Sequence, residues 1–428
     1  MATALPGQTQ PPSAVIIPSE RPLSERFTLP DLTAISFDAS NADEIQVSIG
    51  VMPKQKDAEL KPLALFRRAG GEDARKARVS LHGAVNDDRA KHEQVWQLDA
   101  PQDQNPFELS PADTWAALYA FWIRNDFNER LPVELGSNLS NRDHILAYLT
   151  HTGLGFRAPD AVGQYELLWD RSAFWQGAGA PLGRSWLQAP LPAADAFGPL
   201  TSTSFPHTLS FTKSDNPPVL TAHPLRPPKP APGSIVYSRY IHSVKQHLTL
   251  THINPDDPKH FEAYCRWQNS DHVNKGWRER GSEDYHRQYH KGRLADPHIM
   301  GYILSWDGEP AGYGEASFNK EDGMAAFVGG MGDYDQGTHL LIGEPKFRGR
   351  HRFASSMVSM KHFCFLRESR THIVIGEPRF DLPIIPLLAQ HLPQSWRREV
   401  ELPHKRAVLF LLHRDRFFDA GPSGGIFY

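Results

Sequence analysis

The chain has 428 residues, with 46 basic and 49 acidic side chains and a formal net charge of −3. This balance excludes bulk electrostatic attraction to nucleic acid or to an anionic membrane as the basis of its function. The two cysteines, Cys265 and Cys364, exclude a framework of several disulfides, and the length predicts two domains that each bury a core.

The N-terminal 20 residues predict a disordered tail. They are rich in Pro, Ser and Gln and lack the basic start and apolar core that are typical of a secretory signal. No run approaches the roughly 18 apolar residues that span a bilayer, and residues 425–428 do not match a Ser-Lys-Leu peroxisomal address. We therefore expect a cytoplasmic protein with no membrane partner and no nucleic-acid partner, and a peroxisomal location is the alternative.

Residues 21–204 predict a first domain of strands and helices. Alternating aliphatic side chains in residues 44–51 predict a strand with one buried face, formed by Ile45, Val47, Ile49 and Val51. Aromatic residues at helical spacing after residue 111 predict a helix whose rings lie in the core and do not form a cofactor platform. No phosphate loop or catalytic constellation is found in this half.

Seven prolines between residues 214 and 232 predict a domain boundary. Proline lacks the amide donor that regular structure needs, so residues 205–240 are expected to be a stiff, extended linker. The second domain, residues 241–428, then begins with a strand over residues 247–253 and a helix over residues 256–269.

A further helical stretch, residues 283–291, places His286 and His290 on one face. A zinc site needs more ligands than this pair, and neither a neighbouring Glu nor a clear third ligand accompanies it. The sequence therefore predicts no metal site.

Two apolar runs, residues 298–304 and 311–318, flank Asp307-Gly308 and predict a β-hairpin. A third strand, residues 338–343, leads into a basic loop centred on Gly349 and then into a helix beginning near Arg352. Residues 371–377, 384–392 and 407–413 predict a strand, a short helix and a strand. Together they complete a mixed sheet flanked by helices.

The basic loop predicts a diphosphate site. The first amides of a helix lack internal partners, and the peptide dipoles place partial positive charge there. Gly349 would allow close approach of an anion, and the basic side chains raise the local potential. The alternative is a solvated basic turn in which glycine is needed only for geometry.

Short motifs then follow one another over residues 267–418. They are Asp296-Pro297-His298-Ile299, Gly312-Tyr313-Gly314-Glu315, residues 335–343, Phe347-Arg348-Gly349, Glu377-Pro378-Arg379, residues 402–407 and Arg416-Phe417-Phe418. This set resembles the siderophore-biosynthetic N-acyltransferases of the GNAT superfamily, which include bacterial hydroxylysine acetyltransferases and longer fungal hydroxyornithine acyltransferases.

The resemblance implies an α+β fold of tandem GNAT-like domains, each a mixed, mostly antiparallel sheet flanked by helices, with the first domain degenerate. It implies transfer of an acyl group from acyl-CoA, either acetyl-CoA or a branched acyl-CoA such as anhydromevalonyl-CoA, to the hydroxylamino nitrogen of N5-hydroxyornithine. The alternatives are an acetyltransferase for N6-hydroxylysine or another small amine, and a silent acyl-CoA-binding module.

The resemblance also assigns candidate binding residues. Those for acyl-CoA are Leu341, Ile342, Gly343, Lys346, Phe347, Arg348, Gly349, Arg350, His351 and Arg352. Those for the small hydroxylated amino acid are Trp267, Asn269, Trp277, His298, Glu315 and Asp335. The tryptophans could equally be core residues.

His339 is the first candidate general base, because an imidazole can serve at neutral pH and can also hydrogen-bond an N-hydroxyl group. Its alternative role is a strand histidine bonded to a neighbouring carbonyl. Residues 335 and 339 share a face of the strand, so Asp335 could orient the ring, or it could form a turn.

The second candidate base is Asp381, with Glu377 behind it. In the family a carboxylate follows the Glu-Pro pair at this place and is usually followed by asparagine, where this chain has Leu382. The alternative is that Asp381 caps the next helix.

Overall fold

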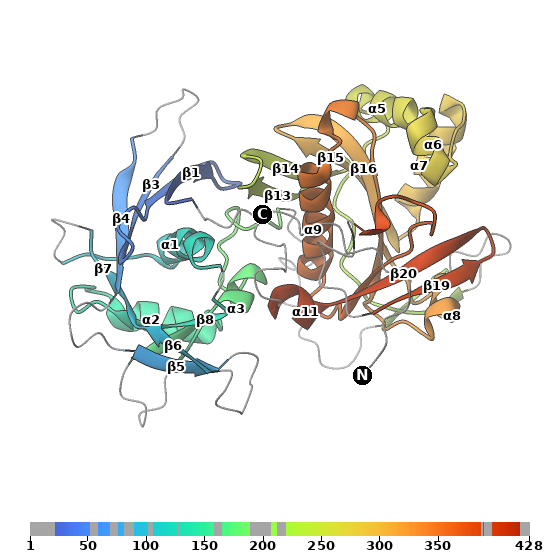
Figure 1. The fold of residues 1–428 in the computed structure, drawn as a ribbon. Coiled ribbons are helices and arrows are strands. Elements are labelled where there is room, and N and C mark those ends of the chain that lie inside the picture. The colour runs from blue at the N-terminus through green and yellow to red at the C-terminus, as the bar shows by residue number, and fades with distance from the viewer. Residues whose placement is uncertain are drawn as a thin grey trace, which may run out of the picture.

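The computed structural model describes residues 22–51, 59–68, 76–80, 90–101, 106–126, 128–157, 165–188, 207–211, 220–386, 388 and 396–419. Two eight-stranded sheets dominate these residues, and Figure 1 shows them side by side, each with its own helices. Both sheets are mixed and mostly antiparallel, with one parallel pair each. The predicted α+β class with two such domains is confirmed.

The first sheet has the order β1-β2-β3-β4-β7-β8-β10-β9. Its strands are β1 (Ser24–Thr28), β2 (Thr33–Asp38), β3 (Glu44–Val51), β4 (Lys61–Arg68), β7 (Trp96–Asp99), β8 (Arg130–Leu135), β9 (Gly155–Arg157) and β10 (Leu167–Asp170). The helices of this half are α1 (Pro111–Arg124), α2 (Arg142–His151) and α3 (Arg171–Trp175), and β5 (Lys76–Ser80) pairs with β6 (Ala90–Gln94) in a separate ribbon.

The helix predicted after residue 111 is α1, and its aromatic rings lie in the core. Ser110 caps the helix by accepting a hydrogen bond from the Asp113 amide, and Trp115 and Trp122 are buried. The strand predicted at residues 44–51 is β3, but Val51 at its end is 74% exposed. A register shift after Val47 disturbs the alternation, so Ile49 is only partly buried against the core and the expected buried face is wrong at Val51.

The second sheet has the order β13-β14-β15-β16-β17-β18-β20-β19. Its strands are β13 (Ile235–Ile241), β14 (Gln246–His252), β15 (Ile299–Trp306), β16 (Glu309–Phe318), β17 (Gln336–Ile342), β18 (Ile373–Gly376), β19 (Trp396–Leu402) and β20 (Lys405–His413). The helices are α5 (Pro258–Gln268), α6 (Asp271–Trp277), α7 (Glu283–Ala295), α8 (Met324–Val328), α9 (Arg350–Arg367) and α11 (Arg414–Asp419), with the 3-10 turn η2 at Pro345–Phe347.

Opposite faces of this sheet carry different helices, as Figure 1 shows. Tyr264 and Trp267 of α5 pack with Tyr313 and Leu341 on one face, whereas the apolar side of α9 belongs to the main core on the other. Alternation along β17 therefore sends Leu341 towards α5 and Leu340 towards α9. The predicted hairpin, loop and helix are confirmed; β19 was not predicted.

The expected linker is partly wrong. Within residues 205–240, β11 (His207–Phe211) pairs with β12 (Leu220–Pro224), and β13 already belongs to the second sheet. A proline can stand at the end of a strand in a two-stranded ribbon, where its missing amide costs no central ladder bond. Of the helix expected at residues 384–392, Ile385, Pro386 and Leu388 are helical, Ile384 lies in a turn, and the other residues lie outside the described part of the chain.

The two halves share a buried polar joint. Nε2 of His362, on α9, lies 2.7 Å from the Trp175 carbonyl oxygen of the first half, and Nδ1 lies 2.9 Å from the Tyr237 hydroxyl. Burial lowers the pKa of His362 to about 3, so the ring is neutral and donates through Nε2 while accepting at Nδ1. Among the residues that the structure describes, no helix is both long and apolar enough to cross a bilayer.

Candidate active site

The second sheet forks where its parallel strands β17 and β18 separate. These parallel strands pair only at Gln336 with Val374 and at Gly337 with Ile375, although β17 continues to Ile342. At the fork, buried Lys361 of α9 donates hydrogen bonds to the Thr338 hydroxyl and to the Ile375 carbonyl oxygen, the latter at 3.0 Å. The strand backbone beyond residue 337 therefore has no β18 partner.

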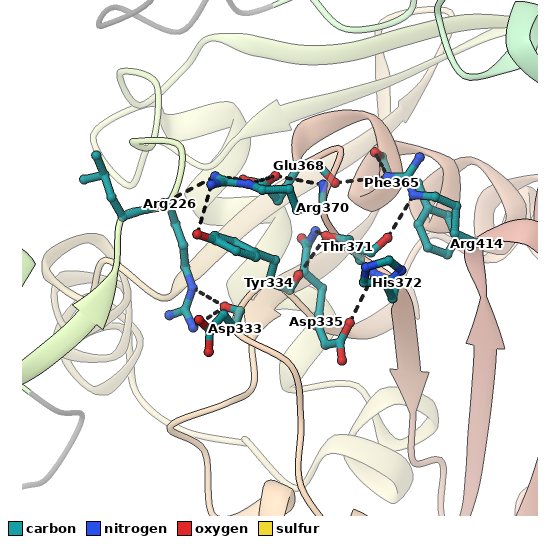
Figure 2. Close-up of polar contacts among 12 residues, drawn as sticks. Arg226, Asp333, Tyr334, Asp335, Phe365, Glu368, Arg370, Thr371, His372 and Arg414 are labelled. Carbon is teal, nitrogen blue, oxygen red and sulfur yellow. Dashed lines mark hydrogen bonds and ion pairs between the residues drawn. The ribbon is translucent and has the colours of Figure 1, made fainter. Parts of the chain in front are cut away.

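A polar network holds the closed end of this fork (Figure 2). Asp335 accepts hydrogen bonds from the backbone amides of His372 and Ile373 and, through its other oxygen, from that of Gly332. The Thr371 hydroxyl donates to the Tyr334 carbonyl oxygen at 2.7 Å. Because Asp335 is occupied by backbone amides at the start of β18, it fixes the strand register, and the expectation that it orients His339 is wrong.

His339 stands between two carboxylates. Its Nε2 lies 2.6 Å from Oε1 of Glu377, and its Nδ1 lies 3.6 Å from Oε2 of Glu315, directly opposite on β16. Lys405 of β20 approaches Glu377 Oε1 at 3.4 Å. Both carboxylates are buried, whereas 45% of the His339 side chain is exposed, so the ring can be reached from solvent.

This arrangement changes the acid–base chemistry of the set. The charge of Glu377, aided by Glu315, raises the pKa of His339 to about 10, against the desolvation that the surrounding protein imposes on the ring. Burial opposes ionisation of Glu315, but bonds from His339 and Arg293 lower the pKa of that carboxyl to about 2. The expectation of a histidine titrating near neutrality is not met, because the free protein holds the ring as an imidazolium.

The pH dependence of thermal stability should reveal the ionisation of His339 and Glu315. The pKa of His339 is higher in the folded chain, so its contribution to stability is complete below about pH 6.5 and is lost as the pH rises towards 10. Glu315 has the opposite sign, with a contribution that is present above about pH 4.5 and lost towards pH 2. We expect His339→Gln to flatten the fall in Tm between pH 6.5 and 10, measured by calorimetry across that range. Parallel curves for the two proteins would contradict the assignment.

Aromatic and basic residues of α6 and α7 complete the face around His339. The Trp277 ring lies 6.1 Å from the His339 ring and 5.8 Å from that of Tyr313. Tyr289 and Arg293 of α7 donate to Glu315 Oε1 at 2.6 and 3.1 Å. Of the predicted substrate residues, the structure thus brings Trp277 and Glu315 together with His339.

Four members of this group were not predicted. They are Tyr289, Arg293, Tyr313 and Lys405. Two signals were available: Tyr289 and Arg293 are spaced i, i+4 on one helix face, and Tyr313 is two residues from Glu315 on one strand face. Lys405 lies in the motif at residues 402–407, but its proximity to Glu377 depends on the pairing of β18 with β20.

The basic loop lies at the end of β17 and opens α9. Gly349 is the helix N-cap, with φ 144°, and it receives no side-chain cap; no heavy atom lies within 4 Å of the position that a Cβ would take. The helix amides that follow are therefore available to an anion. The helix begins at Arg350, two residues before the expected start.

Side chains on both sides of Gly349 hold the loop itself. Arg348 donates to the Gly343 carbonyl oxygen at 2.8 Å, Arg352 donates to Gln246, and Lys346 pairs with Glu309. Phe347 is buried and His351 is exposed. The predicted anion site thus depends mainly on backbone amides, because Lys346, Arg348 and Arg352 are already bonded to protein groups.

Three predicted substrate residues have structural partners. Trp267 packs so closely on Gly343 that a Cβ there would lie 2.1 Å from its ring. The Asn269 side chain bonds both the amide and the carbonyl of Gly281, closing the segment between α6 and α7. His298 lies with Asp296 and His223, and none of its described contacts is with His339.

Asp381 lies outside the ion set around His339. Its two carboxylate oxygens accept from Nε and one terminal nitrogen of Arg379, at 3.1 and 3.0 Å, which lowers the pKa of the carboxyl. The predicted helix-cap role does not describe these contacts. Among the candidate bases, the structure brings only His339 and Glu377 together.

Known proteins resemble most of the chain. Residues 256–383 match the family model for an acetyltransferase (GNAT) domain. Acyltransferase fer5 of Mycosarcoma maydis is 57% identical over 348 residues, covering 81% of this chain and 78% of that protein. Acyltransferase ato1 of Omphalotus olearius is 51% identical over 93% of this chain and 95% of that one. Hydroxyornithine transacylase SID3 of Ajellomyces capsulatus is 32% identical, with 73% of each chain covered.

Proposed function

The chain belongs to the siderophore-biosynthesis acyltransferases of the GNAT superfamily, and from that membership we propose that it acylates the hydroxylamino nitrogen of N5-hydroxyornithine with acyl-CoA. The product is a hydroxamate. The observation that carries this proposal is the position of His339, between two buried carboxylates on the strand that leads directly to the uncapped start of α9.

The acyl-CoA diphosphate is proposed to bind at the start of α9. The amides after Gly349 and the helix dipole favour an anion there, and Arg348 and Arg352 add positive potential while holding the loop. The thioester would then lie along residues 338–342 of β17, the part of this strand that does not pair with β18. Backbone amides of that strand segment are the proposed donors to the oxyanion.

The proposed reaction forms one bond and breaks one. The hydroxylamino nitrogen attacks the thioester carbonyl carbon, and collapse of the tetrahedral intermediate breaks the C–S bond and releases the CoA thiolate. Such a nitrogen is less basic than an alkyl amine and is already neutral near pH 7, so a base is needed only after attack.

His339 is the proposed acceptor of that proton. It acts in its neutral form through Nδ1, whose contact with Glu315 is the longer of the two, while Glu377 at 2.6 Å from Nε2 stabilises the imidazolium that results. Because the free protein holds this ring protonated, we expect kcat/KM to rise with pH towards the raised pKa.

Steady-state assays test the substrate assignment. Purified protein is assayed with acetyl-CoA and with anhydromevalonyl-CoA, each against N5-hydroxyornithine, N6-hydroxylysine and plain ornithine. We expect a higher kcat/KM with N5-hydroxyornithine than with N6-hydroxylysine or plain ornithine. A preference for hydroxylysine or an unmodified amine would replace it, and CoA binding without turnover would identify a silent binding module.

Asp381→Asn tests the other candidate base. Its carboxylate is half-exposed, pairs with Arg379 and lies outside the ion set around His339, so kcat should stay close to the wild-type value. The measurement is kcat with saturating substrates beside the wild-type protein. A loss as large as that of His339→Ala would move the base to Asp381.

A further inference from the structure

Three side chains suited to metal binding meet away from His339. His223 lies in β12, His298 directly precedes β15, and Glu321 follows β16. One ligand atom from each lies within 4.8 Å of the others, and both histidines are buried. The three residues are far apart in the sequence, so no metal-ligand motif with a characteristic spacing could predict them.

The tautomer of His298 directs a lone pair into this cluster. Its Nδ1 lies 3.1 Å from Oδ1 of Asp296, which also accepts the His298 backbone amide at 2.8 Å. A carboxylate at Nδ1 fixes the proton there and leaves Nε2 as an acceptor. That Nε2 faces Oε2 of Glu321, another acceptor, at 4.0 Å. Nε2 of His298 and Oε2 of Glu321 are both acceptors, so a cation between them would stabilise this buried arrangement.

His223 adds a third donor atom. The residue is 2% exposed, and its ring lies 4.8 Å from the ring of His298. Its Nδ1 lies 3.2 Å from Oε1 of Glu321, whereas its Nε2 has no hydrogen-bond partner among the described residues. Buried imidazole nitrogens are normally bonded, so this unpartnered Nε2 is a second, independent sign of a ligand.

We propose that His223, His298 and Glu321 form a zinc site, with Asp296 orienting His298. Two imidazoles and one carboxylate are a common zinc set, with a fourth position left for water. At tetrahedral zinc bond lengths the donor atoms lie about 3.3 Å apart, so small side-chain rotations must close the present separations.

Arg226 limits the affinity but does not occupy the site. It forms a bidentate pair with Glu321, with both contacts at 2.9 Å, and it also donates to the Asp333 carbonyl oxygen, a contact visible in Figure 2. A carboxylate offers about four lone-pair positions, so two remain for an ion. The nearby guanidinium repels a cation, and we expect weaker binding than at a thiolate zinc site.

A zinc ion here would have a structural role. It would join β12 of the expected linker to the start of β15 and to the connection between β16 and β17. Asn319 of that connection lies against Gly337, where β17 still pairs with β18, and its amide donates to the Asp335 carbonyl oxygen. The ion would therefore stabilise the paired ends of β17 and β18, although it would not contact the site around His339.

Zinc binding to the full-length protein tests the proposal. After treatment with a chelator and dialysis, Zn²⁺ is titrated by competition with a chromophoric chelator, and Co²⁺ is added separately to read its visible spectrum. We expect about one equivalent per chain, an intense tetrahedral-type Co²⁺ spectrum and a higher Tm with Zn²⁺. Asp296→Asn should weaken binding about 10- to 100-fold, and His223→Asn at least as much.

His252→Gln is the matched control, since His252 is equally buried but bonds the Pro230 carbonyl oxygen and lies outside the cluster. It should bind Zn²⁺ like the wild-type protein. The proposal is overturned if the wild-type chain binds no zinc, or if His223→Asn and Glu321→Gln bind it unchanged. The zinc titration, the Co²⁺ spectrum and Tm do not depend on acyl transfer. A wrong substrate assignment would therefore not affect this test.

Discussion

Replacing His339 with alanine is expected to lower kcat about 100- to 10,000-fold while leaving the Kd for acyl-CoA unchanged. The ring is held by Glu377 and Glu315 at the mouth of the fork, whereas the proposed diphosphate site lies at Gly349, beyond the end of β17. Proton transfer and CoA binding should therefore be separable. Stopped-flow or steady-state kcat, together with calorimetric CoA titration, measures both quantities.

The pH profile identifies the role of the ring. If His339 is the base, log kcat/KM of the wild-type protein rises with pH towards about 10, and His339→Ala has no such limb. Glu377→Gln removes the largest cause of the raised pKa, so it should move the limb to lower pH. A rate that falls as the pH rises through this range would instead make the imidazolium a proton donor.

A matched control separates chemistry from folding. His144 on α2 is an exposed histidine of the other half, and His144→Ala should leave kcat and the pH profile unchanged. Equal losses of kcat and CoA affinity in His339→Ala would count against a chemical role, because they would show that the whole cleft had been disturbed.

Gly349→Val is expected to have the converse effect, with acyl-CoA affinity reduced about 5- to 150-fold. The backbone φ of 144° is rarely adopted by a residue with a side chain, and about 1 to 3 kcal/mol of strain would move the loop away from this conformation. A branched side chain would also stand where the diphosphate is proposed to approach. Calorimetric titration with CoA measures the change directly.

Gly153→Val provides the comparison for this variant. Gly153 has φ 78° and an equally open Cβ position, but it follows α2 in the first half of the chain. It should share the backbone strain and lower Tm without changing the Kd for CoA. If Gly349→Val binds CoA as tightly as the wild-type protein, the diphosphate does not bind at this loop.

Local patterns were sufficient for most of the second sheet. The hairpin of β15 and β16 followed from two apolar runs around Asp307-Gly308, and α9 followed from a strand leading into a glycine loop and apolar residues at helical spacing. These features depend on periodicity and turn chemistry within short segments, which a sequence displays directly. The family resemblance rested on the order of the same segments.

Local patterns in the sequence thus predicted the mixed sheet of the second domain and the glycine loop at a helix start, and the family resemblance added the tandem architecture and pointed to His339. The role of His339 could be read only from the folded chain, because strand pairing brings Glu315 and Glu377 to its ring and Lys405 to Glu377. The same long-range pairing assigned Asp335 to the backbone of β18 and gathered His223, His298 and Glu321. Charge interactions act through space over a few ångströms, so residues far apart in the chain set each other's pKa only once the sheet has formed.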